Sequence, residues 1–186
     1  MLDASVKLQF SYRRNLPSAV IDWFGAEVGW AHVDAVLPAN DPLPGWLLGA
    51  RSDRPVLGAA WAPRRERRWN GVYCLPAGVQ VRPPNYLFFA RTAIVEIPCT
   101  AAQVAEFYRL LHAQLGKSYS EATIAGFALG CERKVRGAWV CSVLIAWCAC
   151  EAGILPRELF RYVPKLTPDL LYLVALTARH LLRIAG

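Results

Sequence analysis

Hydrophobic and polar positions alternate along much of the first half of the chain, and this pattern predicts β-strands. Asn40-Asp41-Pro42 interrupts the pattern and predicts a turn. The last strand before residue 98 is dense in aromatic and β-branched residues, which favour extended backbone. The expected strands are Val6–Tyr12, Glu27–Leu37, Gly45–Arg51, Gly71–Pro76, Val79–Arg82 and Tyr86–Ile97.

After Pro98 the spacing of apolar residues becomes helical. Thr100 and Gln103 form a capping-box pattern, and Thr167 followed by Pro168 is a second helix start. Because strands come first and helices follow, the order predicts an α+β fold and not a βαβ alternation. The expected helices cover Thr100–Leu115, Glu121–Leu129, Cys141–Ala152 and Thr167 to the end of the chain.

The composition is that of a folded protein. Of the 186 residues 55% are hydrophobic and only 19% are charged, so the chain can bury a core and is not disordered. One domain over residues 1–186 is the expectation for this length. The arginine-rich stretch 51–70 lacks periodicity, and we interpret it as an exposed loop inserted into that domain.

The arginine-rich stretch also contributes to the formal net charge of +7. Its arginines predict a surface that could contact an anion, although a solvated loop is the favoured interpretation. No recognised nucleic-acid module accompanies them, so we expect no specific nucleic-acid partner. The arginines concerned are Arg64, Arg65, Arg67 and Arg68.

Neither an export signal nor a metal site is expected. The first residues lack a charged start followed by an apolar run, and no stretch of about 18 apolar residues occurs, so we expect synthesis in the cytoplasm. The six cysteines include no Cys-x-x-Cys pair, which argues against zinc and against a disulfide framework. Most of them are expected to be small buried residues.

Two positions carry candidate chemistry. His32 lies on an expected strand, where alternation places it on one face with Trp30 and Asp34. Cys141 opens an expected helix, whose positive end can lower a thiol pKa and whose N–H groups can hold an oxyanion. A histidine nearby would take the thiol proton and later protonate the leaving group. Alone, each residue is more often an ordinary core residue. Together they are a candidate nucleophile and base.

Four short segments then occur in the order and spacing of a known family. They are WAHVDAVLP at 30–38, LLGAR at 47–51, GKSYS at 116–120, and CSVL at 141–144 closed by AGI at 152–154. Together they resemble the circularly permuted branch of the NlpC-type papain-like cysteine peptidases, to which the YiiX-like and lecithin–retinol acyltransferase-like proteins are related. In that branch the histidine strand precedes the helix that carries the cysteine. The resemblance implies a permuted papain-like fold, with an antiparallel sheet or barrel followed by packed helices.

The resemblance also implies an activity. The expected protein is a cysteine hydrolase, without a cofactor, that cleaves an amide bond in the peptide part of peptidoglycan. Cys141 would be the nucleophile, His32 the base and then the acid, and the N–H groups of Cys141 and Ser142 the oxyanion hole. Further substrate contacts would come from Trp30, Arg51 and Tyr119. Similar proteins are expected in prophages, so association with a virion or release on lysis would bring such an enzyme to the cell wall.

Three positions depart from the family pattern: Ser120 and Val143 stand where the family usually has acidic residues, and the third departure is Gly49. The family supplies a third polar group from the neighbouring strand to orient the histidine ring. A turn centred near residue 40 would place Gly49 opposite His32, and glycine has no side chain. Asp34, a water molecule or a backbone carbonyl would then have to orient the ring.

Three other functions remain open at this stage. The same nucleophile could act on an acyl-lipid substrate, as related permuted proteins do. A non-catalytic virion component could keep the fold, and the glycine at position 49 supports this alternative. An anion binder that uses the arginine-rich stretch would bind with an affinity that falls steeply with salt.

Overall fold

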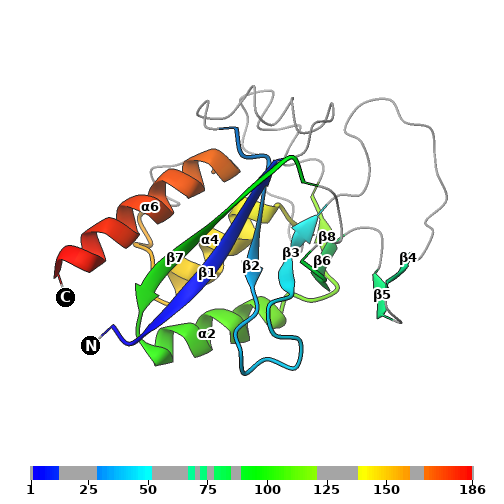
Figure 1. Cartoon of the computed structure of the whole chain (residues 1–186), viewed down its shortest axis with the longest axis horizontal. Helices are drawn as coiled ribbons and strands as arrows, with labels where there is room; N and C mark the ends of the chain where they lie inside the picture. The colour runs from blue at the N-terminus through cyan, green and yellow to red at the C-terminus, as the bar shows by residue number, and fades with distance from the viewer. Residues whose placement is uncertain are drawn as a thin grey trace.

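An antiparallel sheet of five strands is the main element of the protein (Figure 1). The computed structural model describes residues 2–12, 29–51, 67–69, 72–74, 78–84, 89–120, 138–159 and 166–185. The sheet strands are β1 (Ala4–Tyr12), β2 (His32–Val36), β3 (Leu47–Arg51), β6 (Gly78–Arg82) and β7 (Arg91–Cys99), in the order β6-β3-β2-β1-β7. The sheet is open within these residues, and the strands precede the helices as predicted.

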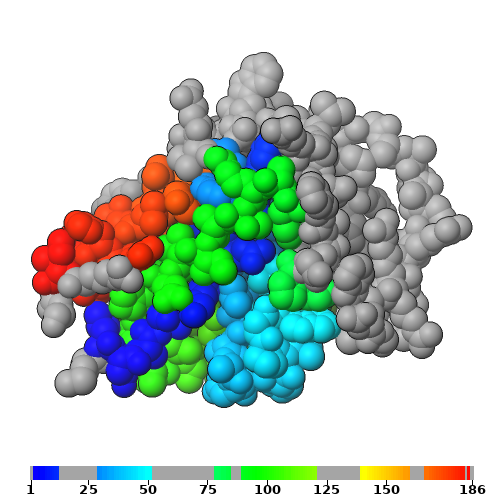
Figure 2. All heavy atoms as spheres, in the orientation of Figure 1, coloured from blue at the N-terminus to red at the C-terminus, as the bar shows by residue number. Residues whose placement is uncertain are grey.

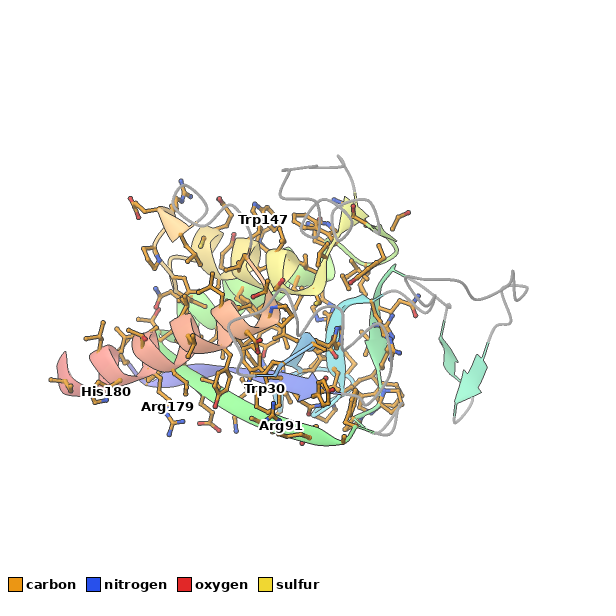
Figure 3. The ribbon with its side chains drawn as sticks, turned by 90° about the horizontal axis from the view of Figure 1, so that it is seen from above. Trp30, Arg91, Trp147, Arg179 and His180 are labelled. Atoms are coloured by element: carbon orange, nitrogen blue, oxygen red, sulfur yellow. The ribbon has the colours of Figure 1, made fainter. Side chains whose placement is uncertain are left out.

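Three helices within the described residues cover one face of this sheet. They are α2 (Ala101–His112), α4 (Cys141–Glu151) and α6 (Pro168–Ala185). Figures 1 and 3 show them in a layer on the same side of the strands, with α6 along β7 and α4 behind β2 and β3. The opposite face is visible in Figure 2, where atoms of β1, in dark blue, and of β7, in green, lie at the surface. The observed architecture is therefore α+β.

The core lies between the sheet and the helices. Leu8 pairs with Ala35 and Phe10 with Val33 across β1 and β2, so these four side chains share one face of the sheet. All four are at most 1% exposed, and the fully buried Leu144 and Ile145 of α4 belong to the same cluster. Alternate residues of β1, such as the exposed Lys7, face away from the helices. The alternation in the sequence therefore did predict the buried face.

The start of α2 is the capping box that the sequence predicts. Thr100 Oγ1 accepts a hydrogen bond from the Gln103 N–H, and Gln103 Oε1 accepts one from the Thr100 N–H. The helix ends at His112, a few residues before the predicted end, because residues 113–116 form turns. Gly116, with φ of 79°, adopts the left-handed conformation that glycine tolerates best.

Most strands differ from their predicted bounds by one or two residues at an end, and two of them differ further. β2 begins only at His32, although the pattern predicts a strand from residue 27, and residues 27 and 28 lie outside the described part. β7 continues through Pro98 to Cys99. Proline lacks an N–H, but among the described strands β7 lies at the edge of the sheet, where proline is tolerated.

The arginine-rich stretch 51–70, predicted as an inserted loop, is described only at residues 51 and 67–69. Arg51 is the last residue of β3, and Arg67–Trp69 forms β4, which pairs with β5 (Val72–Cys74). A run of arginines has no apolar alternation, so its pairing with the next strand was not visible in the sequence. Arg64, Arg65 and the helix expected over 121–129 lie outside the described residues.

A short parallel pair, which the sequence pattern did not predict, lies beside the sheet. It joins β8 (Ser118–Tyr119) to β9 (Ala138–Trp139), immediately before α4. No helix in the described part of the chain is both long enough and apolar enough to cross a membrane.

Candidate active site

Cys141 is the first residue of α4, as the sequence predicts. The residue before it, Val140, has extended backbone, and no side chain caps the helix. The first N–H groups of a helix have no partner within the helix, and the helix dipole is positive there. The sulfur of Cys141, which is only 2% exposed, therefore lies where a negative charge is stabilised.

His32 begins β2 at a local irregularity of the sheet. Ser11 is paired with His32 in the register, yet the Ser11 carbonyl also accepts a hydrogen bond from Ala31 N–H at 3.1 Å. The segment that leads into His32 thus leaves the regular ladder of the sheet.

Asp34 holds the ring of His32. The distance from His32 Nε2 to Asp34 Oδ2 is 2.9 Å, and the two side chains are 15% and 2% exposed. Nδ1 is the ring nitrogen that Asp34 does not engage, and Cys141 is close enough to His32 to affect the pKa of the ring. The structure therefore brings together Cys141, His32 and Asp34, in that order of contact.

The charges around His32 favour its protonated form. Burial alone would lower the pKa of His32, but the charge and hydrogen bond of Asp34, together with the interaction with Cys141, raise it to about 9. The pKa of Asp34 is lowered, because the charge and hydrogen bond of His32 and the charges of Arg82 and Arg51 outweigh its burial. Near neutral pH the pair is thus a carboxylate and an imidazolium.

The predicted position of Gly49 is wrong by two residues. The register pairs Ala35 with Leu48 and Val36 with Leu47, which places Gly49 opposite Asp34 and not opposite His32. A Cβ atom on Gly49 would lie 3.2 Å from Asp34 Cγ and would overlap the carboxylate oxygen Oδ1. The glycine therefore makes room for the carboxylate that orients His32, and the missing side chain at 49 no longer argues for a non-catalytic protein.

A buried arginine that the sequence did not single out lies beside Asp34. Arg82 of β6 is 3% exposed and donates hydrogen bonds to the carbonyls of Gly49 and Gly78, each at 3.2 Å. Its charge lowers the pKa of Asp34 more than the charge of Arg51 does. Arg51 thus contributes charge at the site from the end of β3. The sequence gave no signal for Arg82, because arginines are common in this chain and its burial depends on the folded sheet.

Tyr119 reaches the neighbourhood of the nucleophile through the backbone. It pairs with Trp139 across β8 and β9, and Ser120 N–H donates to the Trp139 carbonyl at 3.0 Å. Trp139 lies two residues before Cys141 in the chain. The structure therefore places the predicted tyrosine segment beside the start of α4.

Ser142 and Trp30 are held in the interior. Ser142 is fully buried, and its hydroxyl donates to the Leu166 carbonyl, so only its N–H remains for the oxyanion role. Trp30 precedes β2, so the expected alternation does not extend back to it. Its ring packs against Phe10 and Tyr172, at centroid distances of 6.4 and 5.3 Å.

The other described cysteines differ from Cys141 in their surroundings. Cys99, Cys148 and Cys150 are buried free thiols, and burial raises the pKa of Cys148 to about 12 and that of Cys150 to about 11. Such thiols are poor nucleophiles. Among the described residues no group of three or more histidine, cysteine or acidic side chains could hold a metal ion.

The remaining histidines lie away from these residues. His112 Nε2 is 3.0 Å from Asp41 Oδ2, in the turn between β2 and β3, and His180 is exposed on α6.

No protein-family model matches the chain, and no curated protein matches it in sequence. The case for a function therefore comes from the residues themselves.

Proposed function

We propose that the protein is a cysteine hydrolase that cleaves an amide bond through a thioester intermediate. The observation that supports this most is Cys141 at the start of α4, beside a His32 whose ring is held by Asp34. A catalytic triad has this arrangement: the nucleophile lies beside the base, and a third group orients the base. The histidine strand precedes the cysteine helix in the chain, which agrees with the resemblance to the permuted NlpC-type peptidases.

The proposed reaction starts with a protonated His32 beside Cys141. The Cys141 sulfur attacks the amide carbonyl carbon, and the N–H groups of Cys141 and Ser142 stabilise the oxyanion. His32 gives its proton to the leaving nitrogen, the C–N bond breaks, and an amine and a thioester remain. His32 then takes a proton from water as the water attacks the thioester. The carboxylic acid leaves and the sulfur returns to its starting state.

The proposed substrate is an amide bond in the stem peptide of peptidoglycan. The support for this class is the resemblance, so the first experiment tests it directly. Wild-type protein and Cys141→Ala are incubated with muropeptides, and mass spectrometry measures new amines and carboxylic acids. We expect products from wild type and none from Cys141→Ala.

Cys148→Ala is the matched control, since Cys148 lies in the same helix but is fully buried with a high pKa. It should keep the activity of wild type. Products from an acyl-lipid substrate and none from muropeptides would move the proposal to lipids. Equal behaviour of wild type and Cys141→Ala on every amide and acyl substrate would refute the enzymatic function.

A further inference from the structure

Two buried hydrogen bonds join the start of α6 to the two halves of the candidate active site. The Ser142 hydroxyl donates to the Leu166 carbonyl, and Ser142 is the residue after Cys141. The Trp30 N–H donates to Asp169 Oδ1 at 2.5 Å, and Trp30 lies two residues before His32. The four residues 166–169 thus contact the segments that carry both proposed catalytic side chains.

These four residues form a stiff unit. Thr167 accepts hydrogen bonds from the N–H groups of Leu170 and Leu171, through its hydroxyl at 3.3 Å and its carbonyl at 3.0 Å, and Pro168 fixes the first helical turn. Ser142 and Asp169 are both fully buried. Breaking one of their hydrogen bonds would leave a buried polar group unsatisfied, which costs about 1–3 kcal/mol.

The His32 side of this connection has a second attachment. Arg91 of β7 donates to the Gly29 carbonyl at 2.7 Å and lies 4.3 Å above the centre of the Trp30 ring. Figure 3 shows Trp30 and Arg91 close together beside α6 and β7. The segment that leads into His32 is therefore held from both sides, by α6 and by the edge of the sheet.

From these contacts we infer that residues 166–169 are a brace that sets the distance between the Cys141 sulfur and the His32 ring. Ser142 and Asp169 act in it as positioning residues, since neither is proposed to touch the reacting atoms through its side chain. The inference rests on the proposed function. Proton transfer needs heavy atoms about 2.6–3.2 Å apart, and a misplacement of about 1 Å can cost 100-fold in rate. Cys141 and His32 come from different elements, so something must fix their separation.

The test uses the reactivity of the thiol itself. The rate of alkylation of Cys141 by iodoacetamide is measured from about pH 5 to pH 9 by peptide mass mapping, because a thiolate paired with an imidazolium reacts well below the usual thiol pKa. We expect Ser142→Ala and Asp169→Ala each to slow alkylation near pH 6 about tenfold or more and to shift the profile toward an ordinary thiol. With the substrate, kcat should fall and KM should stay the same.

Two control variants remove hydrogen bonds away from the candidate active site, one of them exposed and one partly buried. Thr177→Ala deletes a hydroxyl of α6 that donates to the Leu173 carbonyl at 2.9 Å, and Asp41→Ala deletes a carboxylate that accepts the Leu43 N–H at 2.9 Å. Both should keep the wild-type profile. Asp169→Asn retains an acceptor oxygen for Trp30, so it should lose less than Asp169→Ala.

The outcomes separate the brace from the enzyme. If wild-type Cys141 reacts no faster than a buried thiol, the proposed function itself fails. If wild type reacts quickly and Ser142→Ala keeps its rate and pH profile, the brace is refuted while the proposed function stands. Ser142→Ala decides the question even if Asp169→Ala does not fold, which thermal unfolding would show.

Discussion

The side chain of Asp34 can take its position beside His32 only because residue 49 is a glycine. The Asp34 carboxylate occupies the space where a side chain of residue 49 would begin, and from there it holds His32 Nε2 at 2.9 Å. Glycine inside a strand lowers the stability of that strand. The close approach of the buried Asp34 carboxylate explains why β3 nevertheless has a glycine at position 49.

Substitution of Gly49 should therefore disable the site. In Gly49→Ala the new methyl group overlaps Asp34 Oδ1, so the carboxylate must move away from His32. We expect loss of hydrolysis and of fast Cys141 alkylation, together with about 1–3 kcal/mol lower stability from overpacking. Activity is followed by product formation and stability by urea unfolding.

Gly45→Ala is the matched control for this prediction. Gly45 has φ of 76° and no atom within 4 Å of an added Cβ, so alanine there meets backbone strain and no clash. It should lose some stability and keep its activity. Equal loss of activity in both variants would mean that stability, and not the position of Asp34, controls the site.

Sequence reasoning at this scale predicted local features of the chain better than it predicted contacts. Cys141, His32 and Asp34 were candidates because helix starts and strand alternation are local signals. The register of β2 and β3 was not local. It depends on a turn in which Leu37 N–H bonds to the Trp46 carbonyl, and a symmetric turn placed Gly49 two residues away from its true partner.

At the scale of elements, Gln103 of α2 has two roles, one in the local capping box and one in the packing of α2 against the end of α4. Gln103 completes the capping box with Thr100, and its Nε2 donates to the Gly153 carbonyl at 2.6 Å, just after α4. The sequence predicted the first role, because the residues are three apart. The second role joins residues fifty apart in the chain, and only the folded arrangement of α2 and α4 shows it.

Three substitutions at the start of α2 and within it should lower the stability of the protein in the order of the hydrogen bonds that they remove. Thr100→Ala loses the cap and should cost about 1 kcal/mol. Gln103→Ala loses its part of the capping box and the bond to Gly153, so its cost should be larger. Glu106→Ala removes only an exposed pair with Arg109 and should be close to neutral.

Urea unfolding measures this ranking, and alkylation of Cys141 should be unchanged in all three variants. A Gln103→Ala variant no less stable than Thr100→Ala would show that the contact between α2 and the end of α4 contributes nothing to stability.

The other elements show the same difference between local signals and distant contacts. The start of α4 was predicted from local signals, whereas β4, β8 and β9 depend on partners that the pattern of apolar residues does not reveal.

For the whole molecule, the charged pair of His32 and Asp34 links the stability of the fold to pH. The pKa of His32 is raised from 6.5 to about 9, so its contribution is complete below pH 6.5 and is lost as the pH rises through 9. The pKa of Asp34 is lowered from 3.8, so its contribution is present above that value and is lost as the pH falls through the lowered pKa. Both contributions coexist between these limits.

The free energy of unfolding should therefore fall as the pH rises from 6.5 to 9, by up to about 3 kcal/mol from His32. In His32→Gln this part of the slope should disappear, whatever the absolute stability of the variant. The control is His112→Gln, which removes the other described histidine–aspartate pair, between α2 and the turn after β2. Urea unfolding at several pH values measures all three proteins. If His32→Gln keeps the slope of wild type, the folded protein does not raise the pKa of His32, and the charged pair of His32 and Asp34 would have to be abandoned.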